Sequence, residues 1–571
     1  MPEYLTPGVY YEPLDAPPLV RGVRTDIAGF VGLAERGPLD EAVRVESWRQ
    51  FQSQFGGFVH YGYLAYAVKG FFENDGRTCF VVRVAGSTAA RSSLTLKNAA
   101  SKNAASVDVV ELTAADEGTW GDRVCVGLLT QPGAGTFSLV ITRAGTPDRE
   151  VFARLSPDPA HKNFFARVIN EGDARNLASR WVRARVPDSV PAGADLMPDA
   201  LASGMKRGRA YLKGGRDGLA SLTKDDFLGD DDPLATRKKG LGVLERVDAV
   251  AMVCVPDIHI RPAPPPPVIP PPKEPPHDPC RPRTPAPPAD AVPLASATEQ
   301  PPAFTDAEIE DVQRAMIEHC ERLRDRVALL DVPTGAGGRA LTVGEAQQWR
   351  SRFDSQRGFA ALYHPWVKVF DPLRTAGKSV RAVPASGHVA GLCARLDLSV
   401  GVHRAPANQE LFWAEDVTAE VSEEAQGLLN PDGVNCLRPF PGRGIRVYGA
   451  RTVSSDPDWR YLNVRRLLLM IEEAVDEATQ WAVFEPHDFV LRETLVRSVS
   501  GFLETVWRQG ALVGETPRDA FYVKCDDQTN PPSSVDAGRV VTEVGVAPTR
   551  PAEFIVFRVG RTFEELEIVE R

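Results

Sequence analysis

The sequence lacks paired cysteines, long apolar segments and an excess of basic residues. Its eight cysteines are scattered without a CxxC pair, which argues against a zinc ribbon and against a disulfide scaffold. No segment approaches the roughly 18 apolar residues of a membrane span, and the first residues do not have the pattern of a signal peptide. Lys and Arg number 66 against 76 Asp and Glu, a net charge of −10. We therefore expect cytoplasmic assembly, no direct membrane insertion and no nucleic acid partner.

Proline is the residue type in clear excess. Of 48 prolines, 18 lie between Pro262 and Pro302, whereas the composition as a whole, 43% hydrophobic and 25% charged, is that of a folded protein. This segment has too few apolar residues to offset the entropy lost on ordering, and its prolines favour an extended conformation. Residues 261–302 are therefore predicted to be a linker or a disordered surface loop on which the packing of the core does not depend.

Strand and helix patterns alternate on both sides of the proline-rich segment. The expected strands are 27–33, 79–84, 327–332, 360–369, 521–525 and 540–546. The expected helices are 47–55, 63–72, 305–324, 344–353, 456–480 and 488–509. This alternation predicts an α/β fold, with a core sheet and flanking helices assembled from N-terminal and C-terminal parts of the chain.

Residues 87–246 have a different pattern, with short runs of alternating apolar and polar residues separated by Gly, Pro, Asn and Asp. They are predicted to form a mostly β insertion. The apolar run 247–255 then reads as a strand buried on both faces that returns the chain to the core. The expected organisation is an N-terminal extended arm (1–25), first core part (26–86), mostly β surface insertion (87–246), return strand (247–260), proline-rich segment (261–302), α/β and C-terminal core (303–546) and C-terminal strand arm (547–571).

The motifs that would indicate a nucleotide-binding or catalytic site are incomplete in this sequence. Gly377-Lys378-Ser379 is not a phosphate loop, because Pro372 stands where the first glycine is required. The glycines after Gly335 match a dinucleotide fingerprint only loosely, and a turn is the simpler reading. A catalytic triad would require residues such as His388, His403 and Asp397, which lie in one region of the sequence. However, nothing in the sequence places a nucleophile beside a base. We therefore expect no enzyme activity, no cofactor and no metal site.

Several blocks, in order along the chain, resemble the contractile tail sheath family of phage tails, R-type pyocins and extracellular contractile injection systems. The blocks include Pro7-Gly8-Val9-Tyr10, Gly29-Phe30-Val31-Gly32, Ser386-Gly387-His388-Val389-Ala390-Gly391, Gly433-Val434-Asn435, Arg446-Val447-Tyr448-Gly449, Trp459-Arg460-Tyr461, Arg465-Arg466, Phe484-Glu485-Pro486 and Ala520-Phe521-Tyr522-Val523. The resemblance covers residues 1 to about 85 and 245–571, and leaves out the insertion and the proline-rich segment.

The resemblance implies a structural subunit that polymerises as stacked six-fold rings around an inner tube and contracts to drive that tube through a target envelope. The implied partners are further copies of the chain, the inner tube protein, and baseplate and terminal cap proteins; the particle could be released by lysis. Two other classes stay open: a non-contractile scaffold or binding protein, which the β insertion and proline run would suit, and a nucleotide-dependent enzyme, which the failed glycine motifs disfavour.

Short apolar strands at both chain ends lie outside the expected core and need partners for their backbone groups and side chains. The expected subunit-interface residues are Val9, Tyr10 and Tyr11 at one end and Phe554, Ile555, Val556, Phe557 and Val559 at the other. Strand addition to neighbouring subunits would satisfy them, and the resemblance implies it. Residues 13–24 and 547–551 are expected to act as flexible leads that let rigid cores reorient.

Charges on the helix expected at 456–480 suggest a second kind of contact. Arg465 and Arg466 have no acidic residue three or four positions away, and Glu472, Glu473, Asp476 and Glu477 repel one another at that spacing. These side chains either form a solvated face or meet opposite charges on the tube or on adjacent subunits.

Overall fold

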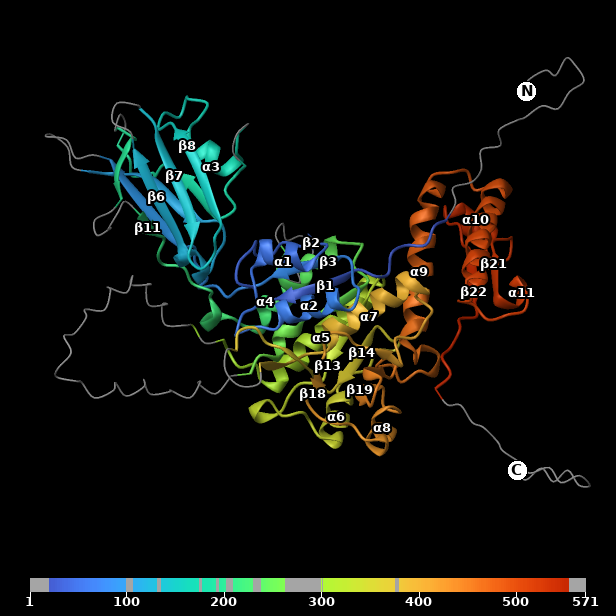
Figure 1. Cartoon of the computed structure of the whole chain (residues 1–571). Coiled ribbons are helices and arrows are strands. Elements are labelled where there is room, and N and C mark those ends of the chain that lie inside the picture. Colours follow the sequence, from blue (N-terminus) through green and yellow to red (C-terminus); the bar gives the residue numbers. More distant parts are fainter. Residues whose placement is uncertain are drawn as a thin grey trace, which may run out of the picture.

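The computed structural model describes residues 20–553, except 99–105, 131–134, 174–176, 192–194, 202–208, 230–237, 262–298, 300 and 375–378 (Figure 1). The expected arm residues Val9, Tyr10 and Tyr11, the group Phe554, Ile555, Val556, Phe557 and Val559, and nearly all of the proline-rich segment therefore lie outside the described residues.

The core of the described chain is one mixed sheet built from segments far apart in the sequence. Its strands, in the order in which they lie side by side, are β17 (Gln409–Glu410), β20 (Gly444–Tyr448), β19 (Val434–Phe440), β14 (Ala360–His364), β13 (Val327–Asp331), β12 (Met252–Cys254), β1 (Ala28–Gly32), β3 (Cys79–Arg83) and β2 (Val43–Val45). Neighbouring strands from β19 to β3 are parallel, and antiparallel strands close both edges. Strands β1, β13 and β14 are buried at every position, as the expected α/β core requires.

Helices pack around this sheet: α1 (Trp48–Phe55), α2 (Leu64–Glu73), α4 (Lys224–Leu228), α5 (Asp306–Leu323), α6 (Val343–Arg350), α7 (Ser386–Ser399) and α8 (Glu423–Leu429). Helix α5 begins as expected, because Thr305 and Glu308 form a capping box. Helix α7 was not expected from periodicity. It packs closely on α2, since a Cβ at Gly387 or Gly391 would lie about 2.5 Å from a backbone oxygen of Ala67 or Phe71.

Three expected strands are clearly shorter than predicted. The strand expected at 540–546 is limited to β22 (Glu543–Val546). The run at 247–255 is a strand only over β12, because the 3-10 turn η3 (Gly240–Arg246) and a further turn occupy the residues before it. The run at 360–369 divides at Pro365, which has no N–H group to continue a strand ladder. Its second half joins a separate sheet of β16 (Val380–Val383), β15 (Val367–Phe370) and β18 (Asp416–Val417).

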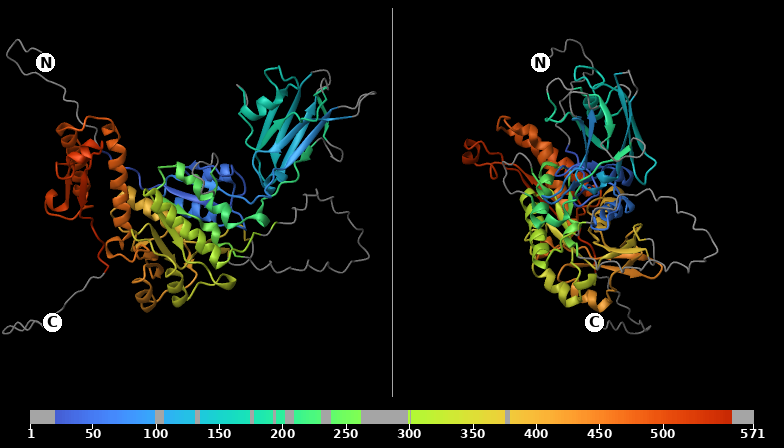
Figure 2. Two further views of the ribbon diagram at one scale, coloured as in Figure 1. Left: turned by 180° about the vertical axis from the view of Figure 1, so that it is seen from behind. Right: turned by 90° about the vertical axis from the view of Figure 1, so that its left-hand side faces the viewer.

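Residues 93–211 form two four-stranded sheets with a hydrophobic cluster of their own. The first sheet contains β10 (Pro198–Leu201), β4 (Ser93–Asn98), β5 (Asp108–Ala114) and β9 (Val182–Arg185). The second contains β11 (Arg209–Tyr211), β6 (Val124–Thr130), β7 (Phe137–Arg143) and β8 (Arg149–Leu155), and α3 (Phe165–Glu171) packs between β8 and β9. This unit stands away from the core sheet, at the opposite end of the molecule from α10 (Figure 2).

The last elements form what we call the C-terminal module. It consists of α9 (Leu462–Thr479), α10 (Phe489–Arg508), α11 (Pro517–Ala520), β21 (Phe521–Lys524), α12 (Pro532–Asp536) and β22 (Glu543–Val546). Helix α9 begins later than expected, because residues from Asp456 onward first form the 3-10 turn η6 (Pro457–Trp459). The remaining 3-10 turns are η1 (Thr119–Arg123), η2 (Leu219–Ser221), η4 (Pro256–His259), η5 (Ala336–Gly338) and η7 (Gln480–Ala482).

Candidate functional site in the C-terminal module

The C-terminal module contains a sheet that is too narrow to cover its own helices. In the described part of the chain this sheet has only two strands, β21 and β22, which pair antiparallel with Phe521 opposite Val546 and Val523 opposite Val544. These four apolar side chains face the α9–α10 cluster but are only partly buried. An isolated two-stranded sheet is marginal in water, and its outer edges present unpaired backbone groups. The module is therefore built like a sheet that has room for further strands.

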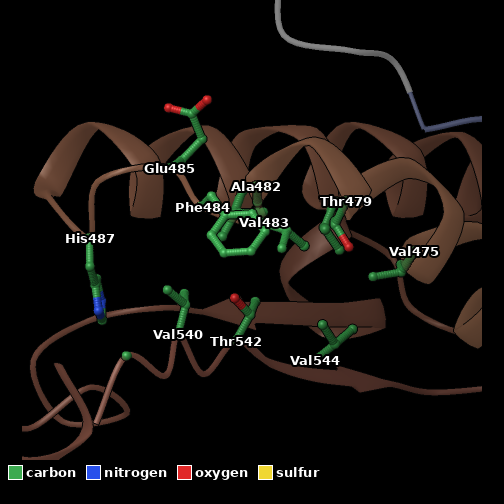
Figure 3. Close-up of a pocket in the computed structure, with 13 residues that line it drawn as sticks. Val475, Thr479, Ala482, Val483, Phe484, Glu485, His487, Val540, Thr542 and Val544 are labelled. Carbon is green, nitrogen blue, oxygen red and sulfur yellow. The ribbon is translucent and has the colours of Figure 1, made fainter. Parts of the chain in front are cut away.

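An open groove of about 720 Å³ lies beside this sheet. One wall comes from the end of α9 and the turn after it, a second from α10, and the floor from β22 and the extended segment before it (Figure 3). Its lining residues are Val475, Thr479, Ala482, Val483, Phe484, Glu485, His487, Leu495, Val499, Gly538, Val540, Thr542 and Val544. Most of them are apolar, so the groove suits an apolar segment better than a charged ligand.

Phe484 is the most unusual residue of the groove. Its side chain is fully exposed, although aromatic side chains are among the most favourable to bury. Its φ of 70° lies in the left-handed region, which bulky residues rarely adopt. In Figure 3 the ring projects between the helices and the segment of Val540 and Thr542, whereas Glu485 points away from the groove. The sequence marks this position only through the block Phe484-Glu485-Pro486, because periodicity does not show which apolar residue stays exposed.

Arg465 and Arg466 are buried and paired inside the subunit, which fits neither of the two expectations, a solvated face or a contact with another protein. Their side chains are 2% and 3% exposed. Arg465 lies against the rings of Phe359 and Trp459 and pairs with Glu472 at 3.0 Å. Glu472 is seven positions along the helix, two turns away, so a search at three or four positions misses the pair.

Arg466 joins three parts of the chain. It donates to Asp397 Oδ1 of α7 at 3.1 Å and to the carbonyl oxygen of Thr25 at 3.0 Å. The Thr25 hydroxyl donates to Asp397 Oδ2 at 2.7 Å. Although desolvation opposes its charge, the Asp397 carboxylate raises the pKa of Arg466, so the arginine stays charged in the interior. This buried group ties the N-terminal chain, the core and the C-terminal module together.

The acidic residues of α9 remain candidates for contacts outside the subunit. Glu472, Asp476 and Glu477 are exposed, and Glu473 is half-buried in the seam between α9 and the core. Burial, together with the nearby carboxylate of Asp325, raises the pKa of Glu473 to about 7. The seam thus brings like charges together at neutral pH.

Glu473→Gln is expected to remove a pH-dependent weakness of the fold. Because the folded-state pKa lies above the ordinary value of 4.5, ionising Glu473 opposes folding, and stability falls as pH rises through about 7. The variant should match the wild type near pH 4.5 and be more stable above pH 7. Urea unfolding at several pH values measures this, with Glu493→Gln, an exposed position on α10, as control. An equal pH dependence in wild type and Glu473→Gln would contradict the expectation.

The residues tested for catalysis have structural roles. His388 is buried, stacks on Trp413 with ring centroids 5.7 Å apart, and burial lowers its pKa to about 4. Asp397 is bound by Arg466 and Thr25 rather than by a histidine. The glycines after Gly335 form the turn η5, whereas Gly377 and Lys378 lie outside the described residues. Where the structure is described, it contains no cluster of His, Cys, Asp or Glu that could hold a metal ion.

The leads that were expected to be flexible are docked where the structure describes them. Val20 belongs to the hydrophobic cluster of the C-terminal module. After β22, the Ala547 and Thr549 amides donate to the carbonyl oxygens of Ala520 and Ala511 at 2.9 and 3.0 Å. No helix within the described ranges combines the length and apolar character needed to cross a membrane.

Comparison with known proteins identifies this architecture. Residues 301–453 match the phage tail sheath protein central domain, and residues 454–562 match the phage tail sheath C-terminal domain. The tail sheath protein of Burkholderia phage BcepMu is 28% identical over 253 residues, 42% of this chain and 50% of that protein. The tail sheath protein of Escherichia phage P2 is 25% identical over 226 residues, 38% of this chain and 53% of that protein. The chain thus spans about half the length of these curated relatives.

Solved structures share the fold over nearly the whole chain. The sheath of an extracellular contractile injection system, the PVC sheath complex in its contracted state, has a TM-score of 0.54 at 19% identity and covers 99% of this chain and 100% of its own. The sheath tail protein of Desulfitobacterium hafniense has a TM-score of 0.52 at 13% identity and covers 91% and 94%. The chain therefore has the fold of sheath subunits. The expected resemblance is confirmed, since residues 301–562 match the central and C-terminal domains of phage tail sheath proteins.

Proposed function

We propose that the chain is the structural sheath subunit of a phage-tail-like contractile injection system. It would assemble in the cytoplasm as stacked six-fold rings around an inner tube, between a baseplate and a terminal cap, and would act without a cofactor or catalytic site. The two sheath domains at 301–562 and the sheath-like fold support this function. The division into arms, split core and surface insertion expected from the sequence is part of the proposal.

The narrow β21–β22 sheet is the observation that carries the proposal. A third and fourth strand would pair its outer edges and cover the exposed sides of Phe521, Val523, Val544 and Val546. The chain ends supply strands of the right kind: Val9, Tyr10 and Tyr11 on one arm, and Phe554, Ile555, Val556, Phe557 and Val559 on the other. The arm strands have apolar residues on both faces, so one face can pack on the helices while the other meets a neighbour.

Strand addition also suits a machine that changes length. Backbone hydrogen bonds between an arm and the β21–β22 sheet can persist while the rigid cores rotate relative to one another. The energy for contraction would then come from core-to-core contacts that form only in the short state, while a kinetic barrier holds the long state. The unit at 93–211 stands away from the core and would tolerate this motion (Figure 1).

Phe484→Asn tests the proposal at the groove. Asparagine adopts a positive φ more readily than phenylalanine, so the free subunit should be as stable as the wild type or about 1 kcal/mol more stable. Loss of the aromatic ring from the groove should nevertheless reduce sheath formation several-fold, as scored by negative-stain microscopy and sedimentation.

Leu177→Asn is the matched control, because Leu177 is also highly exposed but lies in the unit at 93–211. This variant should form normal sheaths. If Phe484→Asn forms normal sheaths, the groove is not part of the assembly contact. A wild-type protein that forms neither long striated tubes nor short wide ones with its tube protein would favour the scaffold alternative.

A further inference from the structure

Buried contacts hold the chain in place just before its C-terminal arm. Arg451 Nε donates to Glu553 Oε1 at 2.9 Å, and a second bond joins Arg451 Nη2 to Glu553 Oε2. The two side chains are 10% and 16% exposed, so this bidentate pair is much less accessible to solvent than an ordinary surface ion pair. Arg451 itself is fixed, because its amide donates to the side-chain oxygen of Asn435 at 2.7 Å. Residue 553 is thereby tied to the core.

The N-terminal arm is held in the same way. Thr25 is bound from both sides, its hydroxyl by Asp397 and its carbonyl oxygen by Arg466. Asp397 and Arg466 are 5% and 3% exposed. A few residues earlier, Val20 packs into the C-terminal module. The N-terminal chain thus has two attachments, an apolar one at Val20 and a buried, charged one at Thr25.

Both attachment points converge on residues 461–466, the beginning of α9. Tyr461 forms a β-bridge with Arg451, which holds Glu553. Asn463 Nδ2 donates to the carbonyl oxygens of His403 at 2.8 Å and Thr549 at 3.3 Å. Arg466 holds Thr25. One and a half helical turns therefore contact the chain at both of its exits.

We propose that residues 461–466, together with Arg451, form an arm anchor that sets the origin and direction of both terminal arms, and so determines which neighbouring subunits the two arms reach. This inference rests on the proposed function. It gives a role to Tyr461 and Arg466 of the sequence blocks, which neither catalysis nor an external charge contact explains.

Chain geometry shows why an anchor at residue 553 matters. If the Arg451–Glu553 pair is lost, the next attachment toward the N-terminus that is shielded from solvent is Thr549, because the Arg550–Asp458 pair between them is 53% and 78% exposed. The arm then gains four residues, which adds up to about 13 Å of reach at roughly 3.3 Å per residue. More importantly, it loses its direction of departure. A strand that samples a larger volume has a lower effective concentration at its intended acceptor and can reach wrong ones.

Glu553→Gln and Thr25→Val test the arm anchor separately. Glu553→Gln keeps the shape of the side chain and removes its charge, and Thr25→Val removes the hydroxyl that binds Asp397. Asp458→Asn is the control, because it breaks the nearby Arg550–Asp458 pair, which is 53% and 78% exposed. Each free subunit is first melted, and the full chain is then assembled with its tube protein and scored for sheath yield and regularity.

We expect at least a fivefold lower yield of regular sheath from Glu553→Gln and from Thr25→Val, with melting temperatures close to the wild type, and no change for Asp458→Asn. If Glu553→Gln lowers the melting temperature, the sheath yield of Thr25→Val decides whether the arm anchor is needed for assembly.

A truncation of residues 554–571 separates this inference from the proposed function. If the truncated chain forms normal sheaths, the C-terminal arm has no role and the strand-addition proposal fails. If truncation abolishes sheaths while Glu553→Gln and Thr25→Val assemble like the wild type, the arms act without the anchor and this inference is overturned.

Discussion

Replacing Arg466 with methionine is expected to lower the free energy of unfolding by about 3–5 kcal/mol, the range for removing one partner of a buried ion pair. The change leaves the Asp397 carboxylate, 5% exposed, with only the Thr25 hydroxyl as a hydrogen-bond donor, and frees the carbonyl oxygen of Thr25. Urea unfolding of the free subunit measures the loss. Arg508→Met removes a pair with Glu504 on the surface of α10 and should change stability by less than about 0.5 kcal/mol.

A double variant distinguishes loss of the ion pair from loss of packing. In Arg466→Met with Asp397→Asn the buried carboxylate is gone, so a substantial part of the lost stability should return. If the double variant is as unstable as the single one, the methylene groups of Arg466 matter more than its charge. Equal stability of wild type and Arg466→Met would show that this buried group does not hold the module to the core.

The environment of Arg466 could not be predicted from the sequence. Its partner Asp397 is 69 positions away, and no helical or strand spacing joins them. Only the packing of α7 against α9 brings them together. An arginine without a partner at helical spacing is therefore expected on a solvated face or at a contact with another protein, although this side chain is only 3% exposed.

Elements with local signals were predicted well. Helix α5 has its capping box, α10 begins at the Asp488 cap, and β1 is a short apolar run that ends at a glycine. Helix α7 has no such signal, because it is buried almost all round and so shows no amphipathic stripe. Its two glycines, which would weaken an exposed helix, are the reason that it can approach α2 so closely.

The groove was only partly accessible to prediction. The block Phe484-Glu485-Pro486 marked the region, but an exposed aromatic residue with a positive φ cannot be told from a buried one by composition. Such a residue makes sense when its burial partner is not part of the same chain. The sequence could therefore predict strands that need a partner, whereas the groove that we propose as their acceptor depends on how β21, β22 and the ends of α9 and α10 pack together (Figure 3).

Deleting Met1–Tyr11 is expected to abolish sheath formation while leaving a folded subunit. Replacing Ile555 and Phe557 together with aspartate should have the same effect, because charged side chains cannot pack on the apolar helices beneath an added strand. Both changes lie outside the described residues, so the packing within 20–553 should persist. Circular dichroism and thermal melting should therefore match the wild type, and electron microscopy should show no tubes.

A double variant makes this test more specific. A subunit without its N-terminal arm still has an acceptor sheet, and a subunit with a damaged acceptor still has arms. Combining a milder arm change, Tyr10→Ala, with Phe484→Asn in one chain should reduce the sheath yield by less than the product of the two single reductions if the N-terminal arm uses this groove, because both changes weaken the same contact. Independent reductions would assign the groove to the C-terminal arm or to the tube, and ordinary long sheaths from the deletion itself would end the strand-addition proposal.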